Sequence, residues 1–181
     1  HESMRILCHV DVTPRSYITV DDAQQMMTDG LFRVRAVTYN VCAPDDVLLK
    51  HFLMQTSKGA LPCMEEFTLS VNDLLSRIVS VPALPDIVRL DVSHSSITCV
   101  KFGRGAFGKL RSLKTCPVSS ARTMHDFLQG LPVEAPCLQS LEMATIDNDL
   151  INDVLRRYAS LQEIRAGKYV YHRPGIRLGT I

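Results

Sequence analysis

The segment from Gly103 to Gly108 has a glycine spacing that could bind a phosphate. Gly103, Gly105 and Gly108 form the G-x-G-x-x-G pattern of dinucleotide sites. In such a site the loop opens a helix directly after a strand, and the helix N-terminus holds the pyrophosphate. Here the apolar spacing places Phe107 in the core and predicts a strand at Leu113, straight after the loop. We therefore expect no nucleotide and no other cofactor.

Side chains that could act as acids, bases or metal ligands are present, but not at catalytic spacing. The six histidines contain no H-x-x-x-H or H-x-x-E pair, and no serine lies in a G-x-S-x-G turn. The acidic pairs at 21–22 and 45–46 lie at expected helix starts, where the helix dipole favours negative charge. Glu65 and Glu66 are neighbours on an expected strand, so their side chains point to opposite faces. The sequence thus predicts no catalytic residues, no metal site and no enzymatic activity.

Six cysteines are scattered along the chain, at positions 8, 42, 63, 99, 116 and 137. They form no C-x-x-C pair and have no histidine at zinc-finger spacing, so we expect free thiols, most of them buried. This usage, with no N-x-S/T glycosylation site, favours a reducing intracellular compartment, the cytoplasm or the nucleus. The chain begins at His1 rather than at a methionine, which leaves a mitochondrial location open.

The overall composition is that of one soluble globular domain. The 181 residues carry a net charge of +1, and 46% of them are hydrophobic and 22% charged. No apolar run approaches about 18 residues, the length that crosses a membrane. The near-zero charge also argues against a dominant phosphate-binding surface. We expect neither a membrane nor a small-molecule cofactor among the partners.

An apolar pattern recurs along the chain. From Met64 onward, Met64, Phe67, Leu69 and Leu74 occupy positions 1, 4, 6 and 11, with Asn72 at position 9. This is the spacing L-x-x-L-x-L-x-x-N-x-L. Equivalent segments start near residues 4, 31, 64, 87, 110, 138 and 161. At positions 1, 4 and 6 of these segments, 19 of 21 residues are apolar, well above the 46% of the whole chain.

Each of these segments predicts a short strand that buries positions 4 and 6. One segment alone cannot bury them, so neighbouring segments must stack into a continuous core. In the second segment this phase places Leu31, Val34 and Ala36 in the core. In the first it places His9 there, which indicates an irregular first strand.

Helical spacing predicts helices between some of the strands. A capped helix is expected over 19–30, and another follows the acidic residues at 45–46. Two more are indicated by apolar residues over 124–128 and 150–158.

The chain resembles the leucine-rich-repeat superfamily along its full length. The stretch from Cys137 to Leu150 resembles the cysteine-containing and ribonuclease-inhibitor-like repeats that are common in F-box proteins. By contrast, residues 97–110 resemble a typical repeat, in which Phe107 packs inside in place of a helix. The resemblance implies one α/β domain over residues 1–181, a curved solenoid (horseshoe) of about seven repeats. It implies a parallel concave sheet, with helices and turns on the convex side.

A concave sheet face implies a surface that binds another protein. Asp91, Lys114, Glu142 and Arg165 alternate in sign at position 5, so they can pair laterally. Residues at positions 3 and 8 have fewer expected partners; they are Arg33, Glu66, Arg89 and His94. The candidate contact residues are Arg33, Glu66, Arg89, His94, Arg111, Lys114 and Arg165. The sequence therefore favours a non-catalytic scaffold or structural subunit of a multi-subunit complex.

Two alternatives stay open. The chain could be the substrate-recognition part of an F-box ubiquitin ligase, as the F-box resemblance implies. It could also be an RNA-associated module, although acidic residues interleave with its arginines and lysines.

The last expected strand, Leu161 to Tyr169, leaves a sheet edge that a partner could cover.

Overall fold

The computed structural model describes residues 9–12, 21, 25, 34–41, 47–71, 77–93, 97–115, 130–146 and 148–173. Two named helices lie in these ranges, α2 (Val47–Ser57) and α4 (Asn148–Arg157). The strands are β1 (His9–Val12), β2 (Ala36–Val41), β3 (Glu66–Val71), β4 (Arg77–Val81), β5 (Arg89–Val92), β6 (Ile97–Phe102), β7 (Ser112–Thr115), β8 (Ser140–Met143), β9 (Glu163–Ala166) and β10 (Tyr169–His172).

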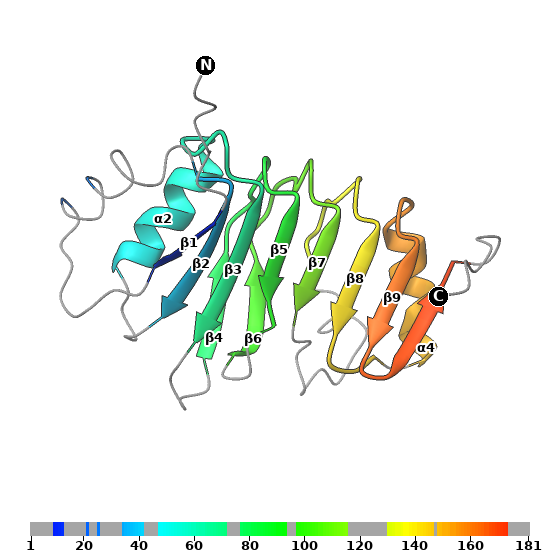
Figure 1. Ribbon diagram of the computed structural model, residues 1–181. Coiled ribbons are helices and arrows are strands. Elements are labelled where there is room, and N and C mark those ends of the chain that lie inside the picture. The colour runs from blue at the N-terminus through cyan, green and yellow to red at the C-terminus, as the bar shows by residue number, and fades with distance from the viewer. Residues whose placement is uncertain are drawn as a thin grey trace, which may run out of the picture.

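Eight strands form one sheet in the order β1-β2-β3-β5-β7-β8-β9-β10, which follows the chain with β4 and β6 left out (Figure 1). All neighbouring pairs are parallel except β9 and β10, which form an antiparallel hairpin. β4 and β6 pair in parallel in a separate sheet. The fold is therefore α/β, with a mostly parallel sheet and few helices.

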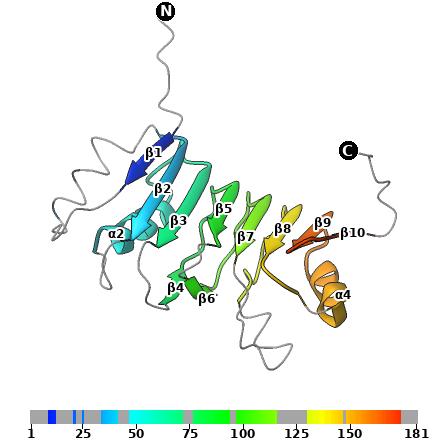
Figure 2. The same ribbon diagram turned by 60° about the horizontal axis from the view of Figure 1, so that its bottom comes forward.

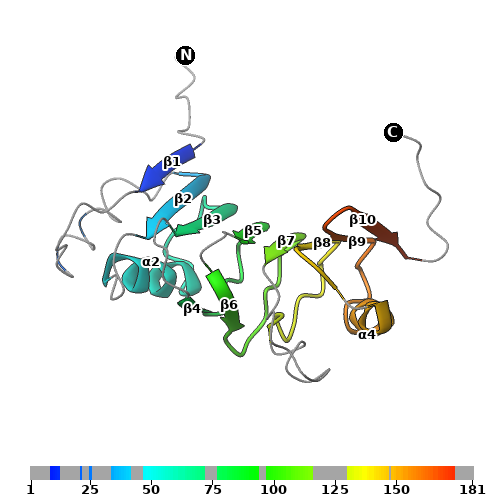
Figure 3. The ribbon, with the colours of Figure 1, turned by 90° about the horizontal axis from the view of Figure 1, so that it is seen from below.

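One face of the large sheet is covered by other elements. Parallel neighbours need a crossover connection, and Figures 2 and 3 show α2, the β4–β6 pair and α4 on the same side of the eight strands. In Figure 3 the strands follow a shallow arc, with these elements on its outer side. No described element covers the inner face. The core therefore lies between the sheet and these elements.

Five segments repeat the same buried positions. The residues at their positions 1, 4 and 6 are all buried, as the sequence predicts for the starts at 64, 87, 110, 138 and 161. They are Met64, Phe67, Leu69, Ile87, Leu90, Val92, Leu110, Leu113, Thr115, Leu138, Leu141, Met143, Leu161, Ile164 and Ala166. The strand pairings align these positions across the sheet, so this part of the prediction is confirmed.

The turn before each of these strands also recurs. The residue three before position 1 is buried in all five segments, at Leu61, Leu84, Phe107, Ala135 and Tyr158. In four of the turns its carbonyl oxygen accepts the position-1 N–H at 3.1–3.2 Å. Each turn thus adds one more buried side chain per segment and aims the strand into the sheet.

A main-chain bond pattern joins the amino ends of the strands. The carbonyl oxygen of Arg35 accepts the N–H groups of Glu65 and Glu66, at 2.8 and 3.1 Å. The oxygens of Glu65, Val88, Arg111 and Gln139 each accept two N–H groups from the next segment in the same way. Since each position-2 carbonyl fixes its neighbour, the register propagates along the sheet.

The first two segments depart from the predicted register. β2 places Ala36 beside Glu66, on the uncovered side, while Val37 and Tyr39 are buried. The predicted start at 31, which put Ala36 in the core, is therefore wrong by three residues. The pairing of His9 with Ala36 shifts the first segment by the same three residues, so the predicted start at 4 is wrong as well. Shifting the register by an odd number of residues exchanges the two faces of a strand. Alanine is small and apolar, so it is compatible with either face.

Both predicted helices that fall within the described ranges are present. α2 buries Leu48, Phe52 and Leu53, and the ring of Phe52 lies 6.1 Å from Tyr39 and 5.0 Å from Phe67 on the sheet. α4 buries Val154 against the core. The expected helix at 124–128 lies outside the described residues, as does that at 19–30 apart from two residues, both helical, at 21 and 25.

Only helices and turns were expected on the covering side, but β4 and β6 form a strand pair there. Both are rich in β-branched and aromatic residues, which favour extended backbone. Phe107, predicted to pack inside in place of a helix, is fully buried with its ring edge-on to Phe102 at 5.6 Å.

The predicted last strand, Leu161 to Tyr169, is not the edge of the sheet. The chain turns at Gly167, whose φ of 58° lies in the left-handed region that suits glycine, and β10 returns along β9. This hairpin covers the edge of β9 and makes β10 the terminal strand of the sheet. Tyr169 and Val170 on β10 remain exposed.

A single arginine fastens the hairpin to the covering side. The Arg173 guanidinium donates to the carbonyl oxygens of Leu155, Tyr158 and Leu161, at 2.5, 2.7 and 2.7 Å. Two of these carbonyls belong to the end of α4 and the residue just after it, where main-chain oxygens lack helical partners. Arg173 thus satisfies the helix end and positions β10 at once.

Candidate functional site

The uncovered side of β3, β5, β7, β8 and β9 presents a polar surface, which we call the open face. Its residues alternate with the buried ones along each strand, so they share the side opposite the core. They are Glu66, Thr68, Arg89, Asp91, Ser112, Lys114, Ser140, Glu142, Glu163 and Arg165. Glu66, Arg89, Lys114 and Arg165 were predicted as contact residues, and the structure places all four here.

Two ion pairs join neighbouring strands on the open face. Arg89 binds Glu66 between β5 and β3. Lys114 Nζ lies 3.1 Å from Glu142 Oε1 between β7 and β8, as the alternating signs predict. The hydrogen bond and charge of Glu142, with a smaller contribution from Asp91, raise the pKa of Lys114. The Glu66–Arg89 pair corrects the expectation that these two residues have fewer partners, because adjacent strands align them directly.

The ends of the predicted charge ladder are satisfied differently. Asp91 accepts hydrogen bonds from the main-chain N–H and hydroxyl of Ser93, at 2.9 and 2.7 Å. Arg165 binds Glu163 on its own strand, at 3.1 and 3.3 Å, rather than Glu142 on the next. A lateral ladder running from Asp91 to Arg165 is therefore not what the structure shows.

Glu163 is the most heavily bonded carboxylate of the open face. The Ser140 hydroxyl donates to it at 2.9 Å, and Arg165 approaches along the strand. Partial burial raises the pKa of Glu163, but the hydrogen bonds from Ser140 and Arg165 and the nearby His172 outweigh it and lower that pKa. The carboxylate is thus held ionised by its neighbours.

The remaining predicted contacts fall elsewhere. Arg111 is exposed one residue before β7, at the amino end of the strands rather than on the open face. Other pairs share that rim: Arg35 binds Glu65 at 2.7 Å, and Lys109 binds Asp86 at 2.7 Å. Arg33 and His94 lie outside the described residues.

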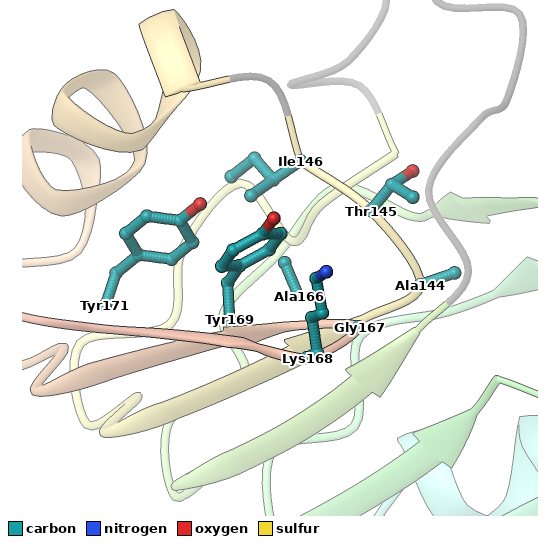
Figure 4. A pocket seen from close by; sticks show the side chains of 8 residues that line it. All are labelled: Ala144, Thr145, Ile146, Ala166, Gly167, Lys168, Tyr169 and Tyr171. Carbon is teal, nitrogen blue, oxygen red and sulfur yellow. The ribbon is translucent and has the colours of Figure 1, made fainter.

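A groove that sequence reasoning missed follows the carboxyl ends of β7, β8 and β9. It consists of two hollows, of about 490 and 310 Å³, that share Ala144 and Gly167. The larger, shown in Figure 4, is lined by Ala144, Thr145, Ile146, Ala166, Gly167, Lys168, Tyr169 and Tyr171. The smaller is lined by Ser93, Lys114, Thr115, Glu142, Met143, Ala144 and Gly167. We call the two together the carboxyl-end groove.

The aromatic residues at 169 and 171 were the one available signal for this groove. Two tyrosines at a spacing of two lie on one side of a strand. The predicted last strand ends at Tyr169, and the residue pattern does not indicate the hairpin that brings both tyrosines back to residues 144–146. Figure 4 shows both rings projecting from the same strand toward the side where Ile146 lies.

The glycine-rich loop serves close packing. The Gly103 N–H donates to the Val81 carbonyl at 2.7 Å. Gly105 has a φ of 123°, and a Cβ there would lie 2.9 Å from the Cβ of Ala83. The chain then enters β7 at Ser112, with no helix between 103 and 115. At Gly105 the positive φ and this close contact both require glycine.

Two cysteines are described with their side chains, and both are exposed and free. Cys63 and Cys137 each lie one residue before a buried position-1 residue, in the turn that leads into a strand. Both thiols are free, and neither is among the thiols expected to be buried, because this turn position faces solvent.

The described side chains include no cluster of three or more histidine, cysteine or acidic residues that could hold a metal ion. Within the same ranges no helix has both the length and the apolar character that a bilayer crossing requires.

Comparison of the chain with protein-family models, with curated proteins and with solved structures found no match.

Proposed function

We propose that the chain is a leucine-rich-repeat protein that binds another protein through the open face, without catalysis. Support for the repeat assignment comes from the five equivalent turn-and-strand segments, each with the same buried positions. The shared two-donor carbonyls at the strand starts support it as well. Stacked segments of this kind form a solenoid, whose long concave surface suits protein binding.

The single observation that carries the functional proposal is the uncovered face of the sheet. Polar side chains stand there in register over five adjacent strands, while the described elements that pack on the sheet all lie on its other side. Exposed ion pairs such as Lys114–Glu142 contribute only about 0–1 kcal/mol each, so a partner can replace them at low cost. The open-face side chains are thus ordered before a partner binds, and the ion pairs that order them are weak enough for a partner to replace.

The partner fits a multi-subunit assembly in which this chain is a scaffold or structural subunit. The alternative is substrate recognition within an F-box ubiquitin ligase. It is supported by the resemblance between residues 137–150 and the repeats of F-box proteins. Exposed free thiols at Cys63 and Cys137 accord with a reducing intracellular compartment.

RNA binding is less well supported. Arg89, Lys114 and Arg165 each contact a carboxylate on the open face. An RNA phosphate would have to displace that carboxylate and then face its repulsion. Binding to mixed RNA with a steep salt dependence would favour the RNA alternative.

Site-specific photo-crosslinking tests the protein-binding proposal. A benzophenone amino acid is placed at Ser112, in the middle of the open face, and separately at Lys101 and Arg156 on the covering side, all within the full chain. Crosslinked partners are identified by mass spectrometry, and the affinity of a purified partner is then measured. We expect capture from Ser112 alone. Capture from the covering positions alone would show that the open face is not the interface.

A further inference from the structure

We propose that the carboxyl-end groove binds an extended peptide segment of the partner, with an apolar side chain against Tyr169 and an acidic side chain at Lys168. This inference rests on the proposed function, because it names the part of a protein partner that is bound. It places the contact at the carboxyl ends of β7, β8 and β9 and the amino end of β10, rather than over the flat middle of the open face.

The shape of the groove suits an extended segment. Its two hollows share the lining residues Ala144 and Gly167, and each has a volume in the range of about 300–1,000 Å³ typical of ligand pockets. In an extended peptide, alternate side chains lie on one side about 7 Å apart. Alternate side chains of the bound segment can therefore reach both hollows, while the apolar and acidic side chains named above contact Tyr169 and Lys168, which both line the larger one.

The larger hollow continues the apolar layer of the core. Paired residues of antiparallel strands share a face, so Tyr169 beside Ala166 and Tyr171 beside Ile164 lie on the core side of the sheet. The two tyrosine rings are 6.4 Å apart, and Tyr169 is nevertheless 56% exposed. An apolar side chain placed beside Tyr169 and Ile146 would shield this end of the core from water. Exposed tyrosines of this kind are enriched at the energetic centres of protein interfaces.

The positive charge of Lys168 in the larger hollow favours an acidic residue in the bound segment. Lys168 Nζ lies 5.3 Å from the centre of the Tyr169 ring and has no carboxylate partner among the described residues. Lys114 in the smaller hollow is instead neutralised by Glu142. The groove thus carries one uncompensated positive charge, beside its most exposed aromatic ring. A carboxylate on the bound segment complements it.

Peptide titration followed by NMR tests the proposal on the ¹⁵N-labelled full chain. The probe is an N-acetylated, C-amidated hexapeptide of sequence Gly-Ser-Phe-Glu-Ser-Gly. Two matched peptides replace its Phe-Glu with Phe-Lys or Ser-Glu. We expect chemical-shift changes centred on residues 144–146 and 166–171, with each matched peptide about fivefold weaker or more. Equal binding of all three peptides would overturn the proposal.

Two pairs of protein variants localise the binding. Tyr169 and Val170 are neighbours with similar exposure, but Val170 pairs with Arg165 and therefore lies on the opposite side of the strand. Tyr169→Ser should weaken the probe about fivefold or more, whereas Val170→Ser should leave it unchanged. Lys168→Glu should weaken it similarly, whereas Lys101→Glu, the same charge change on the exposed far side, should not. Circular dichroism melts verify that all four variants fold.

The outcomes separate this inference from the proposed function. Should Ser112 crosslink a partner while the hexapeptide shifts no groove resonance, the groove assignment is wrong and the open-face proposal stands. Probe binding at the groove without any crosslink from Ser112 would support the groove and contradict the open-face interface. Groove shifts that appear on concentrating the protein alone would identify a second copy of the chain as the occupant and overturn the peptide assignment.

Discussion

Lys114 on β7 and Glu142 on β8 form an ion pair, 3.1 Å from Nζ to Oε1, that links two strands whose sequences are 28 residues apart. The carboxylate of Asp91 lies on the other side of Lys114 in the same row of the sheet. The lysine therefore separates two acidic side chains. Both side chains of the pair are more than 40% exposed, so solvent screens the attraction.

Reversing the charge of Lys114 should lower stability. Lys114→Glu places three carboxylates in one row, and we expect a loss of about 1 kcal/mol in the free energy of unfolding. The loss should shrink in 1 M salt, because like-charge repulsion at the surface is screened. Urea denaturation at low and high salt measures both effects, with Lys101→Glu as the control. A loss that does not respond to salt would contradict this electrostatic explanation.

The lowered pKa of Glu163 predicts a specific pH dependence. A carboxylate whose pKa is lower in the folded state contributes stability above its unfolded value of 4.5, and that contribution disappears as the pH falls through the folded pKa. Ser140→Ala removes one hydrogen bond to Glu163 and should cost about 1 kcal/mol at pH 7. The cost should be smaller at pH 3 than at pH 7, because a growing fraction of the carboxyl group is protonated as the pH falls toward the lowered folded pKa. Urea unfolding at the two pH values checks this, and an equal cost at both would mean that the bond to the ionised form is not what matters.

Arg173 should matter more for stability than its position near the end of the described chain suggests. Arg173→Ala leaves three main-chain oxygens without their donor, and we expect a loss of about 2 kcal/mol. Arg173→Lys should not restore it, because one ammonium group cannot reproduce the geometry of the guanidinium fork. Thermal melts give the stabilities, and hydrogen exchange of β10 shows whether the hairpin opens. Full stability of the lysine variant would contradict the proposed geometry.

Leu90 tests the continuous core. It is 1% exposed between Phe67 and Leu113 of the adjacent strands. Leu90→Asp buries an unpaired carboxylate and should unfold more than one segment, with a loss of cooperative melting by circular dichroism. Ser112→Asp, an acidic substitution on the open face beside Arg89, is the matched control and should melt within a few degrees of the parent. Similar melting of the two variants would mean that the segment starting at Ile87 does not have the described register.

The buried positions of the five later segments could be predicted from the sequence. Leu138, Leu141 and Met143, for example, are apolar at spacings that only one face of a strand satisfies, and all three are buried. The same reasoning failed at Ala36, because a small apolar residue is compatible with either face. Hydrophobic periodicity is a local property, so it predicts which side of its own strand a residue occupies.

Which charged side chains pair with each other on the open face depends on the alignment between strands. The alternation of side chains between the two faces of a strand is enough to predict that Glu66, Arg89, Lys114 and Arg165 lie on the surface. The register brings Glu66 to Arg89, while Arg165 reaches Glu163 on its own strand. Which charges pair is decided by distances between side chains from separate segments, and spacing along the chain does not contain these distances.

The carboxyl-end groove was decided by the tertiary structure alone. Its larger hollow needs the turn at Gly167 to return Tyr169 and Tyr171 beside β9, and the end of β8 to bring Ile146 near them. The sequence by itself determined the apolar layers and the short strands, because these follow from residue type and period. The groove arises where the hairpin formed by the turn at Gly167 meets residues 144–146, about twenty residues earlier in the chain, so the stacking of strands decides which side chains meet.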